Sequence, residues 1–170
     1  MRKRLAEADP NAASRVVDRI ADVPDGEPVA LYVAVGSELD PAPLAHALLA
    51  AGRSLCLPVT IQRDAPLIFR RWTPGAPLEM DLAGCPAPLP LSEAVDPGLI
   101  LCPLLAFDDF GGRLGQGGGY YDRTFAARPG VTRIGLAYAG QAVGRIPMER
   151  HDMALHGVLT ETGYRPSRKV

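Results

Sequence analysis

Short apolar runs alternate with helix-like stretches along this chain, and that order leaves few folds open. The runs are "PVALYVAV" (28–35), "SLCLPVTI" (54–61), "LILCPLLAF" (99–107) and "VTRIGLAYA" (131–139). Continuous runs of this length predict strands buried on both faces, as in a parallel sheet. Between the first two, "GSELDPAPLAHALLAAG" predicts a helix that begins at Asp40 or Pro41 and ends before Gly52. Strand, helix and strand in this order form a βαβ unit, so we expect an α/β fold with a largely parallel sheet.

The rest of the chain completes one domain over residues 1–170. The patterns predict a helix over 11–22, a further strand in "APLIFRRWTPG", an ordered proline-rich surface loop over 74–98, a helix beginning at "YYDRTFAA" and a short strand in "VLTET".

The charge and composition of the chain argue against several classes of binding partner. The net charge is −1 and the pI is about 6.3, which argues against a nucleic-acid coat or a polybasic membrane anchor. No apolar run is long enough to cross a bilayer, and no apolar signal core follows "MRKRLAEADP", so we expect a cytoplasmic protein. Cys56, Cys85 and Cys102 lack metal-ligand spacing and are expected to be buried, reduced thiols.

A glycine-rich loop follows the third run, in "AFDDFGGRLGQGGGYYDRTFA" (106–126). In parallel sheets, ligands bind beyond the carboxyl ends of the strands, which is where this loop should lie. Clustered glycines let consecutive N–H groups face one anion, the following helix adds its positive end, and Arg113 can bind a phosphate oxygen. The loop lacks the Lys-Ser/Thr of a P-loop, and Tyr120 stands where a dinucleotide loop has its third glycine. The alternative is a flexible turn, which needs fewer glycines.

Residues 103–126 resemble the signature of the 5-formyltetrahydrofolate cyclo-ligase family. That signature resembles P-x-x-A-F-D-x-x-G-x-R-L-G-x-G-x-G-Y-Y-D-R, and every fixed position is filled here. Weaker similarity covers "GSELDPAPLAHALLAAGRSLCLPV", "FRRWTPGAPL" and "RIPMERHDMALHGVLTETG".

The resemblance implies ATP- and Mg²⁺-dependent cyclisation of 5-formyltetrahydrofolate to 5,10-methenyltetrahydrofolate, with release of ADP and phosphate. It implies a three-layer αβα sandwich of the kind shared with ribose-5-phosphate isomerase and CoA transferases. The γ-phosphoryl group would pass to the formyl oxygen, giving an imidate phosphate that the N10 amine attacks. Such a reaction needs mainly positioning and charge neutralisation from the protein.

The same resemblance assigns roles to residues of this sequence. The expected catalytic residues are Arg113, Tyr121 and Asp122. The expected ATP-binding residues are Arg4, Arg113, Leu114, Gly115, Gln116, Gly117, Gly118, Gly119, Tyr120 and Tyr121. The expected folate-binding residues are Glu38, Asp40, Trp72, Gly117, Gly118, Gly119 and Tyr120. The expected Mg²⁺ ligands are Asp122 and Asp152.

Structural roles compete with several of these assignments. Asp40 suits a helix N-cap, Trp72 suits the rim of the core, and either tyrosine suits packing under the helix. Asp108 is expected to brace the loop through backbone N–H bonds. Arg2, Lys3 and Arg4 are expected to take the part of basic residues that family members carry in an N-terminal helix.

Two other functions stay open: a non-catalytic folate- or nucleotide-binding module, and a related ATP-dependent enzyme with another substrate. The first is suggested by the N-terminal segment and by His156, which stands where the family usually has an acid. We expect a monomer that binds a small reduced folate and neither nucleic acid nor membrane.

Overall fold

A sheet of seven strands forms the centre of the computed structural model, which describes residues 1–168. In spatial order the strands are β11 (Gly163–Pro166), β10 (Gly157–Thr160), β9 (Thr132–Leu136), β6 (Leu99–Pro103), β1 (Val29–Ala30), β2 (Leu55–Val59) and β3 (Ile68–Arg71). The five inner strands are parallel, and the edge strands β11 and β3 run antiparallel to their neighbours. The prediction of a largely parallel sheet is confirmed, and the carboxyl ends of the inner strands share one edge, the carboxyl edge.

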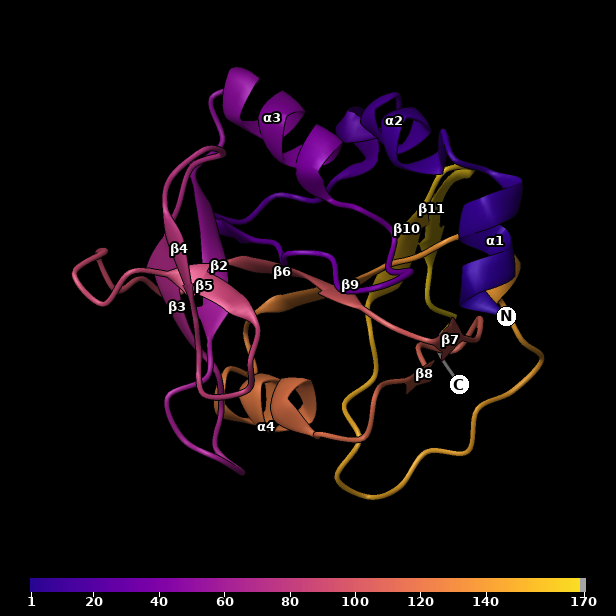
Figure 1. Cartoon of the computed structure of the whole chain (residues 1–170). Helices are drawn as coiled ribbons and strands as arrows, with labels where there is room; N and C mark the ends of the chain where they lie inside the picture. The colour runs from indigo at the N-terminus through magenta and orange to yellow at the C-terminus, as the bar shows by residue number, and fades with distance from the viewer. Residues whose placement is uncertain (169–170) are drawn as a thin grey trace.

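Helices cover both faces of this sheet (Figure 1). One face carries α1 (Arg2–Ala8), α2 (Ala12–Val17), the 3₁₀ turn Ile20–Asp22 and α3 (Ala42–Ala50), and the other carries α4 (Tyr120–Ala127). Alternate residues of β6 serve the two layers: Leu99 and Leu101 pack in the cluster of α2 and α3, and Ile100 packs with Phe125 of α4. The three-layer α/β sandwich is therefore confirmed.

The predicted helices are present with adjusted ends. The helix predicted to begin at "YYDRTFAA" is α4, and the helix after Pro41 is α3, which ends before Gly52 at a φ of +82°. The helix predicted over 11–22 is divided in two. The α-helical hydrogen-bond pattern ends after Val17. There the Arg19 N–H donates to the carbonyl of Val16, three residues earlier, as in a 3₁₀ turn.

The proline-rich stretch 74–98 contains more structure than a loop. It forms a hairpin of β4 (Leu78–Met80) and β5 (Pro86–Pro88). Asp81 closes the turn, because its Oδ1 accepts the N–H groups of Ala83 and Cys85, each at 2.9 Å. Prolines were read as a sign of loop, but a two-stranded ribbon consists only of edge strands, where proline is tolerated.

All four predicted strands are shorter than their apolar runs, and two of the runs differ most from the prediction. The run 28–35 pairs in the sheet only as β1, because side chains then redirect the backbone: the Tyr32 hydroxyl donates to the carbonyl of Leu39, and the Val35 N–H donates to Glu38. The run 99–107 divides into β6 and β7 (Ala106–Phe107). β7 pairs with β8 (Arg113–Leu114) in a small separate ribbon.

The structure also tests the predictions about the cysteines and about membrane-spanning segments. Cys56 and Cys102 are buried and free, whereas Cys85 is exposed, so the prediction of three buried thiols was wrong for Cys85. Cys85 ends the turn of an exposed hairpin, which an apolar sequence context did not reveal. Across residues 1–168, every helix is too short or too polar to cross a membrane.

Candidate active site

The glycine loop, residues 115–119, joins β8 to α4 on the carboxyl side of β6. Gly117 and Gly119 have φ values of +88° and +63°, which L side chains rarely adopt, so glycine is required at both. In the described part of the chain, no acceptor is found for the backbone N–H groups of residues 115–119. Exposed N–H groups at a helix N-terminus can bind an anion, so this geometry is compatible with the phosphate site that the sequence predicts.

Asp108 braces the turn that leads into this loop. Its Oδ1 accepts the N–H groups of Phe110 at 2.8 Å and Gly112 at 2.9 Å, and its Oδ2 accepts that of Ile146 at 2.8 Å. Burial alone would raise the pKa of this carboxyl, but the backbone bonds and the nearby Arg145 lower it below its ordinary value. The predicted bracing role is confirmed, and it extends to the segment around Ile146.

Arg113 and Asp122 form a buried pair beside the loop. Nη2 of Arg113 lies 2.8 Å from Oδ2 of Asp122, and the exposed fractions of the two side chains are 7% and 20%. Met153 completes the connection: its carbonyl accepts from Nη1 of Arg113 at 2.8 Å, and its N–H donates to Oδ1 of Asp122 at 3.0 Å. The guanidinium also lies 5.0 Å from the ring centroid of Phe125. β8, α4 and the 142–155 segment are thus joined at one charge pair.

The two tyrosines of α4 occupy different surroundings. Tyr121 packs against Phe125, with ring centroids 5.9 Å apart, and burial followed by nearby Cys102 and Glu38 raises the pKa of its phenol well above the ordinary value. Tyr121 therefore keeps its proton and can only donate or accept a hydrogen bond. The ring of Tyr120 lies under the guanidinium of Arg123, 5.2 Å from the centroid.

Arg123 was not among the predicted site residues. Its Nη2 donates to the carbonyl of Gly118 at 2.5 Å, so it holds one end of the glycine loop against α4. The signal was present, because residues three apart on a helix are neighbours and Arg123 stands three after Tyr120.

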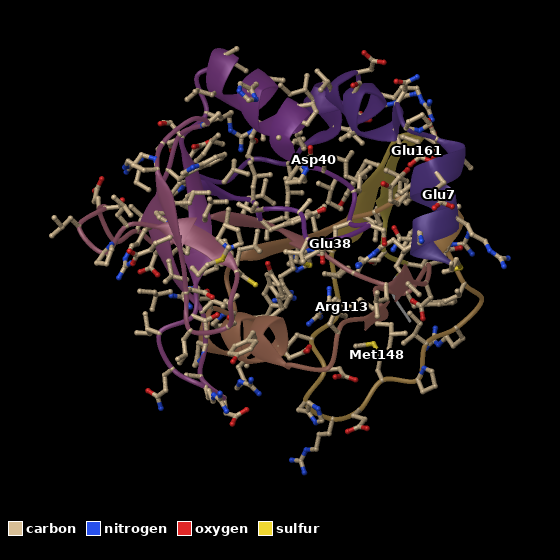
Figure 2. The ribbon with its side chains drawn as sticks, viewed as in Figure 1. Glu7, Glu38, Asp40, Arg113, Met148 and Glu161 are labelled. Atoms are coloured by element: carbon tan, nitrogen blue, oxygen red, sulfur yellow. The ribbon has the colours of Figure 1, made fainter. Side chains whose placement is uncertain are left out.

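Glu38 approaches the loop from the other side of the carboxyl edge. Its Oε1 accepts from Nε2 of Gln116 at 2.9 Å, and its Oε2 accepts from the N–H of Val35 at 2.9 Å. Nη1 of Arg2 lies 3.6 Å from Oε1, and Nε of Arg2 donates to the Ser37 hydroxyl at 3.2 Å. Figure 2 shows Glu38 and Arg113 near the middle of the molecule. The predicted proximity of Glu38 to the glycine loop is thus observed.

Three predicted site residues lie elsewhere. Asp40 is exposed and lies toward α3 (Figure 2), where its Oδ1 accepts the Ala42 N–H at 2.9 Å. The N-cap residue of α3 is Pro41, so the predicted N-cap role of Asp40 was wrong by one residue. The backbone N–H of Trp72 donates to the carbonyl of Leu55, at the start of β2, so this residue lies at the edge opposite the loop. Arg4 is exposed on α1, whereas Arg2 of the same helix reaches Glu38. Arg2 and Arg4 are two residues apart and therefore lie on different faces of α1. A cluster of basic residues in the sequence does not show which of them faces the site.

Carboxylates near the charge pair are few. Oδ2 of Asp152 accepts the Glu149 N–H at 2.7 Å, and the next residue, Met153, is bonded to Asp122. Within residues 1–168 there is no group of three or more His, Cys, Asp or Glu side chains arranged for a metal. His156 is occupied elsewhere, since its Nδ1 accepts the Arg133 N–H at 3.0 Å.

This donor set suits a hard cation held jointly with a ligand. Mg²⁺ commonly takes one or two protein carboxylates and completes its shell with waters and phosphate oxygens. Asp122 supplies such oxygens at the border of the loop, and its side chain keeps some access to solvent. The residues therefore fit a cation that arrives with phosphate groups better than a closed, all-protein metal site.

Comparisons with known proteins agree with this geometry. The model of the 5-formyltetrahydrofolate cyclo-ligase family matches residues 1–161. A protein of Escherichia coli (strain K12) named 5-formyltetrahydrofolate cyclo-ligase is 35% identical over 146 residues, covering 78% of this chain and 76% of its own. A protein of Mycolicibacterium smegmatis with the same name is 37% identical over 144 residues, covering 79% and 74%.

A solved structure supports the same assignment. The 5,10-methenyltetrahydrofolate synthetase of Aquifex aeolicus superposes with a TM-score of 0.78 at 28% identity, covering 99% of this chain and 92% of its own. The synthetase of Mycoplasma pneumoniae, at 19% identity and a TM-score of 0.68, shares the fold. With the complete signature folded around one charge pair at the carboxyl edge, this chain belongs to the 5-formyltetrahydrofolate cyclo-ligase family.

Proposed function

We propose that this protein is an enzyme that cyclises 5-formyltetrahydrofolate to 5,10-methenyltetrahydrofolate, using ATP and Mg²⁺ and releasing ADP and phosphate. The observation that carries the proposal, beside family membership, is the glycine loop itself. Its N–H groups have no acceptor in the described part of the chain, it follows the largely buried cation Arg113, and its Gln116 bonds to the buried carboxylate Glu38. The cation suits a polyphosphate, and the carboxylate suits the N–H donors of a pterin.

The phosphate side of the site is built from the loop and Arg113. The N–H groups of residues 115–119 would surround the phosphates, with Leu114 at the entry and Tyr120 at the exit of the loop. Arg113 is held by Asp122 and the Met153 carbonyl, so its charge is already oriented before a nucleotide arrives. Arg2, rather than Arg4, is the basic residue of α1 that lies at this site.

The folate side is built from Glu38 and the residues that face it. Glu38 would accept N–H groups of the pterin, and Gly117–Gly119 with Tyr120 would lie against the folate. Tyr121, whose phenol stays protonated, would donate a hydrogen bond at the formyl end. Neither Asp40 nor Trp72 enters this proposal, because Asp40 bonds to the first residue of α3 and Trp72 lies at the opposite edge.

Asp122 is the carboxylate that would hold Mg²⁺, with Asp152, which precedes the Met153 bonded to Asp122, as the second candidate. The cation would neutralise charge on the phosphates that it shares with the protein.

The chemistry divides into two displacements. The formyl oxygen attacks the γ-phosphorus and ADP leaves, which gives an imidate phosphate. The N10 amine then attacks the formyl carbon and gives up its proton, and inorganic phosphate carries away that oxygen and the proton. Arg113 and the loop N–H groups would neutralise the oxygens on which negative charge gathers.

Absorbance tests this function directly. Purified protein, Mg²⁺ and 5-formyltetrahydrofolate should give the near-ultraviolet absorbance of methenyltetrahydrofolate only when ATP is added. Binding of both ligands without any product would favour the binding-module alternative. ATP binding without formyl-folate binding would favour an enzyme with another substrate.

The setting of the reaction is part of the proposal. We propose a single-domain monomer that acts in the cytoplasm on a small molecule, without a nucleic-acid or membrane partner, in keeping with a net charge of −1. Elution of the protein as a dimer in size-exclusion chromatography would overturn the monomer.

A further inference from the structure

Gln116 connects the two halves of the proposed site through one hydrogen bond. The residue stands at a variable position of the signature, and its Nε2 donates to Oε1 of Glu38 at 2.9 Å, across 78 positions of sequence. Glu38 is buried, whereas Gln116 belongs to an exposed stretch of the loop. An exposed segment is thus tied to a buried carboxylate, and we call this contact the Gln116–Glu38 latch.

The glycine loop has few other ties. Arg123 holds the carbonyl of Gly118 near α4, and in the described part of the chain the loop N–H groups have no acceptor. A Cβ placed on Gly115 or Gly117 would meet no atom within 4 Å, so the loop has open space around it. The position of residues 115–117 therefore depends strongly on the latch.

Glu38 is only partly satisfied in this arrangement. Its Oε2 has a good bond from Val35, but Oε1 has only the Gln116 amide and an Arg2 nitrogen 3.6 Å away. That nitrogen, Nη1 of Arg2, is buried without a hydrogen-bond partner. A ligand N–H that binds Oε1 would replace the neutral amide of Gln116 and leave the rest of the pocket in place.

We propose that Gln116 is a positioning residue that makes the folate and nucleotide sites cooperate, because binding at either site has to open the Gln116–Glu38 latch. A folate donor takes Oε1 away from Gln116, and phosphates draw the loop N–H groups around themselves. The first ligand to bind breaks the Gln116–Glu38 hydrogen bond. The second ligand then binds without the free-energy cost of breaking it. This inference rests on the proposed function, because it takes Glu38 as the folate-binding carboxylate.

Thermodynamic linkage between the two sites predicts that each ligand raises the affinity of the protein for the other. The nucleotide should bind more tightly when folate is present, and folate should gain by the same factor when the nucleotide is present. One hydrogen bond to a charged acceptor predicts a factor of about ten. Removing the amide with Gln116→Ala should tighten each ligand when it binds alone and bring the coupling factor close to one.

Titration calorimetry measures this coupling. We would titrate 5-formyltetrahydrofolate and a non-hydrolysable β,γ-imido ATP analogue with Mg²⁺, each alone and in the presence of the other. The proteins would be the wild type, Gln116→Ala, Gln116→Glu and the matched control Gln62→Ala, a glutamine in another exposed loop. Both Gln116 variants should lose the coupling, since a carboxylate at 116 repels Glu38, and the control should keep it.

The outcomes separate this inference from the proposed function. Wild-type coupling near one, or full coupling in Gln116→Ala, would overturn the latch even in an active enzyme. Failure of the wild type to bind formyl-folate at all would overturn the proposed function together with the latch. A simple structural role for Gln116 would lower the melting temperature and leave the coupling factor intact, which would also count against the inference.

Discussion

At the scale of single residues, the site depends on charges whose partners are already in place. Arg113 is buried with Asp122 and a carbonyl, so its guanidinium has little freedom to leave the loop. Asp122 in turn is fixed by the Met153 N–H. Such preorganisation is the main contribution that a protein can make to phosphoryl transfer.

Asp122→Asn should lower turnover about a hundredfold, because it removes the charge that orients Arg113 and would hold Mg²⁺. The amide oxygen can still accept the Met153 N–H, so we expect a loss of about 2 kcal/mol of unfolding free energy, or about 6 °C in Tm. Steady-state kinetics and thermal unfolding of the same samples measure both. Asp109→Asn is the matched control, since Asp109 belongs to the same signature but pairs with Arg165 at the surface. Equal activities of the two variants would make Asp122 structural.

The thiols should differ sharply in reactivity. Burial raises the pKa of Cys56 to about 12 and of Cys102 to about 11, so at pH 8 almost none of either is thiolate. Cys85 is exposed, although partial burial and the nearby carboxylates of Asp81 and Glu38 also raise its pKa. A chromogenic disulfide reagent should therefore modify one thiol of the native protein, slowly, and none in Cys85→Ser. Modification of two thiols without unfolding would contradict these burial assignments.

At the scale of elements, the glycine loop is positioned by neighbours distant in sequence. The ribbon β7–β8 brings the chain to the loop, α4 takes it away, and the 142–155 segment closes over the connection through Ile146 and Met153. Asp108 is central to this assembly because one carboxylate serves both the turn and that segment.

Asp108→Asn should destabilise the fold by about 3 kcal/mol, because one amide oxygen cannot replace both oxygens of a buried carboxylate that accepts three N–H groups. The pKa of Asp108 is lowered on folding, so its contribution is fully present above the ordinary value of 3.8 and is lost as pH falls through the lower, folded value. Denaturant unfolding of wild type and variant from pH 7 to pH 2.5 should show a constant difference that shrinks only below about pH 4. A difference that does not change with pH would show that Asp108 does not act through its charge.

At the scale of the whole molecule, the parallel order of the inner strands explains why the site exists where it does. Parallel strands bring their carboxyl ends to one edge, so the segments that follow β1 and β6 meet there although Glu38 and Gln116 are 78 positions apart. Helices cover both faces of the sheet (Figure 1), and Glu38 and Gln116 lie at this edge.

The sequence was sufficient for the sheet and for the loop, because both depend on local patterns. Continuous apolar runs indicate buried parallel strands, and the fixed spacing of the signature identifies Arg113 and Asp122. It was insufficient for Trp72 and Arg4, because side-chain placement depends on which sheet edge or helix face a residue occupies. The β4–β5 hairpin was not predicted because its prolines indicate a loop. Its turn is stabilised by the Asp81 side chain, which accepts two backbone N–H groups.

Oxygen labelling tests the central claim, that the loop and Arg113 promote phosphoryl transfer from ATP to the formyl oxygen. 5-Formyltetrahydrofolate labelled with ¹⁸O in the formyl group would be turned over with ATP and Mg²⁺, and the inorganic phosphate would be examined by mass spectrometry. We expect one ¹⁸O atom in each phosphate released, in step with methenyltetrahydrofolate. Product formation with unlabelled phosphate would show that the formyl oxygen leaves by another route and would contradict the proposed mechanism.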